Sequence, residues 1–206
     1  MRLAPKKGAA QALPVEDDAA RLFRAGGRER VSLLRLDSVC KAFPARRRNG
    51  APMEALQPVS ADVAQGEFLT IVGPSGCGKS TLLSLIAGLL PATSGEVRIG
   101  DTVVNGPYAD IGIVFQKDLL LPWRTALANI LVQAEVRGLD KQRLRPRALE
   151  LLALVGLEGF ADFYPHELSG GMRQRVSICR ALLHDPPLLL MDEPFELGRA
   201  SGRGRV

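Results

Sequence analysis

One stretch of the sequence combines glycines, a lysine and hydroxyl side chains at the spacing used to bind phosphate groups. It reads GPSGCGKST, and its members are Gly73, Pro74, Ser75, Gly76, Cys77, Gly78, Lys79, Ser80 and Thr81. In this pattern glycine N–H groups surround an anion, the lysine reaches the β- and γ-phosphates, and the Ser80 hydroxyl ligates Mg²⁺. We therefore predict a binding loop for a nucleoside triphosphate. The alternative is a glycine-rich turn that precedes a helix by chance.

The pattern needs a strand before it and a helix after it, and the flanking residues predict both. Residues 68–72, FLTIV, form an apolar run that is typical of a buried strand. Leucine and isoleucine then recur between residues 82 and 89 at a spacing that places them on one helix face. We expect this helix to begin near Gly78, where the positive end of its dipole faces the anion.

Two acidic residues follow a second apolar run. Residues 188–191, LLLM, predict a parallel strand covered on both faces. Asp192 and Glu193 come directly after it, at the carboxyl end where such sheets bind ligands. We expect Asp192 to hold Mg²⁺ through water, and Glu193 to orient or deprotonate an attacking water. An acidic strand end that only meets solvent is the alternative.

A serine and two glycines open another predicted helix, in the stretch LSGGMRQR over residues 168–175. Ser169 suits a helix N-cap, and Gly170 and Gly171 leave backbone N–H groups open to an anion. The apolar face of this helix comprises Met172, Val176, Cys179 and Leu183. A capped helix and a second phosphate contact explain the stretch equally well.

The remaining patterns predict an α/β protein with a helical insertion. Strands are expected over residues 31–39, 53–63, 96–104 and 111–115, the last ending at Gln116. Between residues 117 and 168 the period becomes helical, with helices over 127–136 and, after the breaker Pro146, over 147–155. Residues 1–30 show no sustained period and predict a disordered leader.

Composition limits the classes of protein that this chain can represent. Its 206 residues, 46% hydrophobic and 24% charged, suffice for one sizeable core. Much of the net charge of +5 lies in arginine clusters near the ends, and no aromatic residues are interleaved with them, which favours solvated loops over a nucleic-acid surface.

The cysteines and the hydropathy pattern bear on where the protein works. Cys40, Cys77 and Cys179 are odd in number and scattered, which fits a reducing cytosol better than a disulfide framework or a zinc site. No stretch reaches the roughly 20 apolar residues that span a bilayer, so we expect another chain to hold this one at any membrane.

Four ordered motifs together resemble those of the ATP-binding cassette (ABC) ATPases: residues 73–81, Gln116, residues 168–174 and residues 188–193. The resemblance runs from about residue 33 to residue 195 and identifies the chain as a member of that family. It implies a P-loop NTPase core in an ABC ATPase domain of residues 31–195. That core would have a mostly parallel sheet, an antiparallel β subdomain and the helical insertion of residues 117–168.

The resemblance also implies ligands and partners. ATP and Mg²⁺ would bind, with Phe43 stacked on adenine, Gln116 sensing Mg²⁺ and the lytic water, and Ser169, Gly170 and Gly171 contacting the γ-phosphate held by a second cassette. Two cassettes, identical or different, would close head to tail over two ATP molecules and move the helical insertion against a transmembrane permease. A solute-binding protein would take part indirectly, and no nucleic acid is expected. The chain would be peripheral, at the cytoplasmic face of the cell membrane.

The branch of the family is indicated by residues 116–124, QKDLLLPWR, followed by Asn129 and Ile130. This pattern is similar to the cassettes of nitrate, sulfonate and taurine importers, so we expect an ATP-hydrolysing subunit that energises uptake of such a small anion. A cassette protein acting on nucleic acid or ribosomes is a further possibility. Such proteins usually carry two cassettes or a long coiled coil, and this sequence shows neither.

The sequence departs from the family pattern after Phe195. Residues 196–206 are rich in Gly and Arg where the family has a Gly-Ala-Leu-Asp loop and then a strand with a switch histidine. This predicts an aberrant tail, a missing C-terminal part of the core, and a chain that is truncated or frame-shifted. In the family the later strand lies between the phosphate-loop strand and strand 188–191, and its loss would orphan backbone groups at about 1–3 kcal/mol each. The alternative function is therefore that of a truncated, non-hydrolysing remnant.

Overall fold

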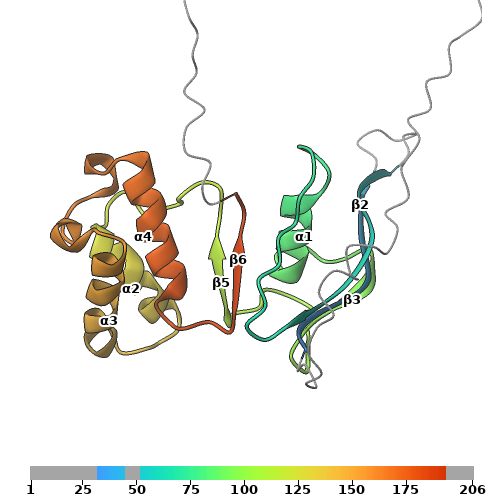
Figure 1. The fold of residues 1–206 in the computed structure, drawn as a ribbon, viewed down its shortest axis with the longest axis horizontal. Coiled ribbons are helices and arrows are strands. Elements are labelled where there is room, and N and C mark those ends of the chain that lie inside the picture. Colours follow the sequence, from blue (N-terminus) through green and yellow to red (C-terminus); the bar gives the residue numbers. More distant parts are fainter. Residues whose placement is uncertain (1–31, 45–51, 194–206) are drawn as a thin grey trace, which may run out of the picture. The chain divides into compact units, whose positions relative to one another are not determined.

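The computed structural model describes residues 32–44 and 52–193 (Figure 1). The predictions made for the leader of residues 1–30, for the arginine clusters near the ends, and for the tail of residues 196–206 lie outside the described residues.

Four of the described strands form an antiparallel sheet in the order β2-β1-β3-β4. They are β1 (Ser32–Phe43), β2 (Met53–Ala64), β3 (Ser94–Ile99) and β4 (Thr102–Val103). Alternation in β1 buries Leu34 and Leu36 and exposes Arg35. A register shift at Ser38, whose φ is +48°, keeps Val39 on the same buried face. The sequence prediction of strands at these positions is confirmed.

Residues 67–72 contradict the prediction of a buried strand ahead of the phosphate loop. They form no strand, and the side chains of Phe68 and Val72 are 89% and 88% exposed. None of the described strands pairs with this segment, so its backbone has no ladder and its apolar side chains have no covering layer. An apolar run becomes a strand only where neighbouring strands and a packed face receive it.

Helix α1 (Lys79–Ile86) begins immediately after the phosphate loop, as predicted. Its buried side chains, Leu82, Leu85 and Ile86, pack in one hydrophobic cluster with the antiparallel sheet. Leu89 lies beyond the end of the helix and is 47% exposed, so the predicted apolar stripe is shorter than expected. Packing against the sheet is what holds the start of α1 and, with it, the end of the loop.

Two short strands form a separate parallel pair. Strand β5 (Ile111–Val114) pairs with β6 (Leu188–Met191), and the two lie side by side in Figure 1. The ladder continues one step further, because the N–H of Asp192 donates to the carbonyl of Val114 at 2.9 Å. Only Leu190 of β6 is fully buried, so the strand is less covered than predicted. The pair nevertheless brings Phe115 and Gln116 beside Asp192 and Glu193 at one edge.

The helical insertion contains α2 (Ala126–Val136) and α3 (Lys141–Leu154), which pack with α4 (Gly170–Leu182) around a second hydrophobic cluster (Figure 1). Two short 3-10 turns, Glu158–Phe160 and Pro165–Glu167, connect α3 to α4. The prediction that Pro146 precedes the second helix is wrong, because α3 starts at Lys141. Asp140 caps its first turn by accepting from the N–H of Gln142 at 2.8 Å, and Pro146 lies inside the helix at the expense of one backbone hydrogen bond.

Asn129 is fully buried in this helical region and fastens the loop before α2. Its Oδ1 accepts from the N–H of Leu121 at 2.7 Å, and its Nδ2 donates to the carbonyls of Leu121, Arg124 and Thr125. A buried amide that meets this many partners fixes the loop conformation, because a buried polar group without partners is costly.

All three cysteines are free thiols, with Cys77 exposed and Cys179 buried. Within the described residues, no helix combines the length and the apolarity that crossing a membrane requires.

Candidate functional site

The phosphate loop adopts a backbone that only glycine allows at two positions. Gly76 and Gly78 have φ angles of +84° and +99°, in the region that side chains rarely occupy. A Cβ atom at Gly78 would also lie 2.6 Å from the carbonyl oxygen of Ala55 in β2. No side chain caps the start of α1, so backbone N–H groups of its first turn remain available to an anion.

Lys79 turns back over this loop. Its Nζ donates to the carbonyls of Gly73 at 2.9 Å and Pro74 at 3.1 Å, and lies 3.8 Å from Oε1 of Glu193. The side chain of Lys79 is 18% exposed and that of Glu193 is 40% exposed, so the ion pair stands at the mouth of the site. The ammonium group is therefore shared between the loop and the acidic end of β6, although residues 79 and 193 are far apart in sequence.

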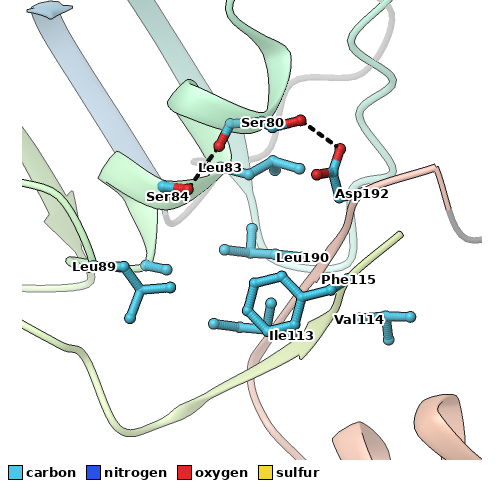
Figure 2. Close-up of a pocket in the computed structure, with 10 residues that line it drawn as sticks. Ser80, Leu83, Ser84, Leu89, Ile113, Val114, Phe115, Leu190 and Asp192 are labelled. Atoms are coloured by element: carbon cyan, nitrogen blue, oxygen red, sulfur yellow. Dashed lines mark hydrogen bonds between the residues drawn. The ribbon is translucent and has the colours of Figure 1, made fainter. Parts of the chain in front are cut away.

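Ser80 and Asp192 meet directly. The Ser80 hydroxyl donates to Oδ1 of Asp192 at 3.0 Å, across the contact between α1 and the end of β6 (Figure 2). Beneath them lies a small pocket with mainly apolar walls, lined among others by Leu83, Phe115 and Leu190. A hydroxyl and a carboxylate at this distance are oxygen ligands of the kind that Mg²⁺ prefers.

Gln116 and Glu193 complete the cluster. The Nε2 of Gln116 donates to Oε2 of Glu193 at 3.2 Å. Glu193 has a φ of +48°, which is uncommon for a residue with a long side chain. The two oxygens of Glu193 thus face different groups, with Lys79 near Oε1 and Gln116 on Oε2.

The structure therefore brings five of the predicted site residues into one place: Lys79, Ser80, Gln116, Asp192 and Glu193. The other loop residues, Gly73, Pro74, Ser75, Gly76, Cys77, Gly78 and Thr81, are held next to them by chain continuity. Phe43 lies instead at the end of β1, where the Nζ of Lys41 is 5.3 Å from the centre of its ring.

Ser169, Gly170 and Gly171 stand at the start of α4, outside this group of five. The Ser169 hydroxyl accepts from the N–H of Met172 at 3.3 Å, which confirms the predicted N-cap. The apolar face predicted for this helix is also confirmed, since Val176, Cys179 and Leu183 are buried.

No role was predicted for Asp118, Arg173 or Arg180. Both arginines contact Asp118, two residues after Gln116. Arg173 donates from Nε to Oδ2 of Asp118 at 2.8 Å, and Arg180 donates to the carbonyls of Asp118 and Leu119. The partners are 55 to 62 residues apart. No local pattern in the sequence signals such a contact, because only the packing of α4 brings the groups together.

The cluster has the chemistry of a triphosphate site. A lysine and open helix N–H groups offer positive charge to phosphate oxygens, and a hydroxyl and a carboxylate offer oxygen ligands to a divalent cation. The described residues contain no group of three or more His, Cys, Asp or Glu side chains that could hold a metal by themselves.

Comparison with known proteins places this site in a family. The sequence profile of the ABC transporter family matches residues 56–196, which include the phosphate loop, the LSGG stretch and the acidic strand end. The chain belongs to the ABC transporter family. The family resemblance seen in the sequence motifs is thereby confirmed.

Several curated relatives of this cassette are ATP-binding proteins. An uncharacterized ABC transporter ATP-binding protein of Methanocaldococcus jannaschii is 47% identical over 82% of this chain and 62% of its own length. The taurine import ATP-binding protein TauB of Rhizobium johnstonii is 48% identical over 79% of this chain and 62% of its own length. TauB of Yersinia pestis is 49% identical over 68% of this chain. The cassette spans only 55–62% of the length of these relatives.

Solved structures support the same fold. A dimeric ATP-binding cassette in a post-hydrolysis state, bound to ADP and Pi, matches with a TM-score of 0.69 and 35% identity over 79% of this chain and 75% of that chain. A dimeric bacterial ABC transporter cassette matches with a TM-score of 0.70 and 38% identity over 78% of this chain and 74% of that chain. The predicted fold class, a P-loop NTPase core of the ABC type, is confirmed.

Proposed function

We propose that this cassette is the ATP-binding and hydrolysing subunit of an ABC importer. The observation that carries the proposal is the meeting of Lys79, Ser80, Gln116, Asp192 and Glu193, each of which contacts a residue more than 70 positions away. Their distances of 3.0 to 3.8 Å are short enough for all five to act on one bound triphosphate.

Each of these residues has a role that its chemistry supports. Lys79 supplies positive charge to the phosphates, and Ser80 and Asp192, with Gln116 nearby, would hold Mg²⁺, which neutralises charge on the phosphates when bound. Glu193 orients or deprotonates the attacking water, and its hydrogen bond with Gln116 fixes the direction of its carboxylate. We further propose that Phe43 contacts the adenine.

The partners follow from the family. Both solved cassettes that match are described as dimeric, which supports a dimer of cassettes in which Ser169, Gly170 and Gly171 contact the nucleotide of the other subunit. Leu119 and Trp123 follow Gln116 closely and are 53% and 70% exposed. An exposed apolar surface beside the nucleotide site suits the docking of a transmembrane permease, which would hold the cassette at the cytoplasmic face of the cell membrane.

The transported solute is proposed from relatives alone. Two of the proteins described above are named for taurine import, and residues 116–124 are similar to the nitrate, sulfonate and taurine branch. We expect a small anion of this kind. Expression of the cassette in a strain that lacks its own taurine import ATPase should restore uptake of labelled taurine, and uptake of nitrate instead would reassign the solute.

A second candidate function, ATP binding without hydrolysis, is favoured by one observation. Residues 67–72 lead into the phosphate loop, yet they pair with none of the described strands and expose Phe68 and Val72 almost fully. The loop is then held mainly from the α1 side. Hydrolysis requires the phosphates and the carboxylates to keep their relative positions to within a fraction of an ångström, and a loop held from one side does so less well.

One pair of measurements tests both candidates on the purified chain. Titration with the fluorescent nucleotide mant-ATP in the presence of Mg²⁺ should show saturable binding, and release of phosphate from Mg·ATP reports turnover. Binding with turnover that Glu193→Gln removes supports the ATPase. Binding with turnover at background supports the second candidate. Absence of binding contradicts both.

A further inference from the structure

Three side chains of α4 hold residues 115–119, the segment that contains Gln116, two of them through its backbone and one through the Asp118 carboxylate. Gln174 donates from Nε2 to the carbonyl of Phe115 at 3.3 Å. Arg180 donates to the carbonyl of Leu119 at 2.8 Å and to that of Asp118 at 3.0 Å. Arg173 donates to the Asp118 carboxylate at 2.8 Å. The segment is therefore fastened on both sides of Gln116 by a single helix.

These contacts are partly shielded from solvent. The side chains of Arg173 and Asp118 are 35% and 28% exposed, and burial lowers the pKa of Arg180 from its ordinary value. Ion pairs and charged hydrogen bonds that are partly withdrawn from water are screened less than surface pairs and constrain geometry more. Arg173 also donates from its Nη1 to the carbonyl of Leu168 at 2.8 Å, which ties the same guanidinium to the residue before Ser169.

The backbone that Arg180 holds has an unusual conformation. Leu119 has a φ of +44°, in the left-handed region that bulky side chains avoid. Such a conformation persists where surrounding contacts determine it, and the hydrogen bond from Arg180 to the Leu119 carbonyl is one such contact. Release of this bond would let the segment relax and would shift Gln116.

Gln116 is placed to transmit such a shift to the nucleotide site. Its Nε2 lies 3.2 Å from Oε2 of Glu193, so movement of a few tenths of an ångström in residues 115–119 changes this hydrogen bond. We propose that Asp118, Arg173 and Arg180 form a clamp of positioning residues that sets Gln116 against Glu193. The clamp also links this site to the start of α4. The inference rests on the proposed function, because the site must receive Mg·ATP for the position of Gln116 to matter.

The test compares Arg173→Ala with Arg175→Ala. Arg175 lies two residues further along α4 and donates to the carbonyls of Gly171 and Val155, not to residues 115–119, so it is a matched control. Affinity for mant-ATP is measured with Mg²⁺ and again with EDTA. We expect Arg173→Ala to weaken binding about fivefold with Mg²⁺ and to leave binding in EDTA unchanged. Arg175→Ala should match the wild type in both conditions.

Two further measurements separate positioning from general destabilisation. Amide hydrogen exchange over residues 115–119 should become faster in Arg173→Ala and stay slow in Arg175→Ala. In a background that carries Gln116→Ala, the additional loss of Mg²⁺-dependent affinity on Arg173→Ala should disappear, because the clamp acts through Gln116. Arg173→Lys keeps the charge beside Asp118 and should recover part of the affinity. This variant replaces Arg173→Ala in the test if the alanine variant does not fold.

The outcomes are distinct. Unchanged exchange in Arg173→Ala, or faster exchange with full Mg²⁺-dependent affinity, overturns the positioning role. Loss of affinity in EDTA to the same degree as in Mg²⁺ also overturns it, because the variant then acts on the whole site. Failure of the wild-type chain to bind mant-ATP overturns the proposed function itself, and the inference falls with it. Failure of the inference alone leaves the wild type binding Mg·mant-ATP.

Discussion

The two sheets formed by the described strands differ in the length of their strands and in the connections between them. In the antiparallel sheet, β1 and β2 are 12 residues each and follow one another in the chain, so their pairing closes over a short connection. In the parallel sheet, β5 and β6 are four residues each and are joined by the whole helical insertion and α4. Antiparallel neighbours need only a turn, whereas parallel neighbours need a crossover and are stable chiefly when covered and paired on both sides.

The difference matters because the proposed nucleotide site draws on both sheets. Asp192 and Glu193 extend from β6, whereas Lys79 and Ser80 belong to α1, which packs against the cluster of the antiparallel sheet. Residues 67–72, which follow β2 in the chain and lead into the phosphate loop, belong to neither sheet and expose their apolar side chains. The parts of the site on α1 and at the end of β6 are therefore supported by packing. Residues 67–72, which lead into the phosphate loop, support it least.

A pair of core and surface substitutions gives the largest expected contrast. Leu152 is fully buried in the helical cluster, and Leu152→Ala should lower the free energy of unfolding by about 2–5 kcal/mol through lost burial and a residual cavity. Val72 is 88% exposed, and Val72→Ala should change stability by no more than about 0.5 kcal/mol. Urea denaturation measures both. Equal losses would mean that residues 67–72 are packed in solution.

Removal of the loop cation should come next in size. Lys79→Ala deletes the charged group that faces the phosphates, and a charged hydrogen bond contributes about 1.5–3 kcal/mol, equivalent to roughly 10- to 150-fold in affinity. Titration with mant-ATP and Mg²⁺ measures the loss. Lys141→Ala, which removes a lysine that pairs with Glu135 in the helical region, should leave the affinity unchanged. Equal affinities of Lys79→Ala and the wild type would remove Lys79 from the site.

Thiol alkylation compares an accessible cysteine of the phosphate loop with a buried cysteine of the helical region. Cys77 is exposed within the phosphate loop, whereas burial of Cys179 raises the pKa of its thiol to about 11. N-ethylmaleimide should modify Cys77 in the native protein, spare Cys179, and block mant-ATP binding by steric exclusion. Mass spectrometry of peptides locates the adduct. Cys77→Ser should bind nucleotide before and after treatment, and full binding by protein alkylated at Cys77 would contradict the prediction.

Protonation of His184 should give the smallest effect on stability. This side chain lies where the ends of α2 and α4 meet the start of β5. Burial, and then the charge of Arg137, lower the pKa of His184, whose Nε2 lies 2.7 Å from an Arg137 nitrogen; Asp110 and Asp185 oppose the shift. The unfolded state then binds the proton more readily, so stability is complete above the ordinary value of 6.5 and falls as the pH drops toward the lowered pKa.

His184→Gln removes this titration. Urea midpoints of wild type and variant are measured at pH 8 and at pH 5.5. The midpoint of the wild type, relative to that of the variant, should be lower at pH 5.5 than at pH 8. A constant difference between the two pH values would show that His184 does not titrate in this range.

The sequence predicted most of the local structure because local chemistry decides it. Period-two alternation located β1, the serine and two glycines located the start of α4, and the glycine pattern located the phosphate loop. The predictions were wrong where contacts with residues distant in the sequence outweighed the local pattern. Pro146 is a helix breaker by itself, yet the cap at Asp140 and the burial of Ala148, Leu151 and Leu152 carry α3 through it.

The candidate site shows the same division. Residue types and spacing pointed to Lys79, Ser80, Asp192 and Glu193, since a loop that binds phosphate has a recognisable sequence, and the family resemblance added Gln116. Only the tertiary structure decided that Lys79 lies against Glu193, that Ser80 donates to Asp192, and that α4 fastens the segment of Gln116. It also decided that the apolar run at residues 67–72 is no strand, because a strand depends on the neighbours that pair with it and not on its own residues.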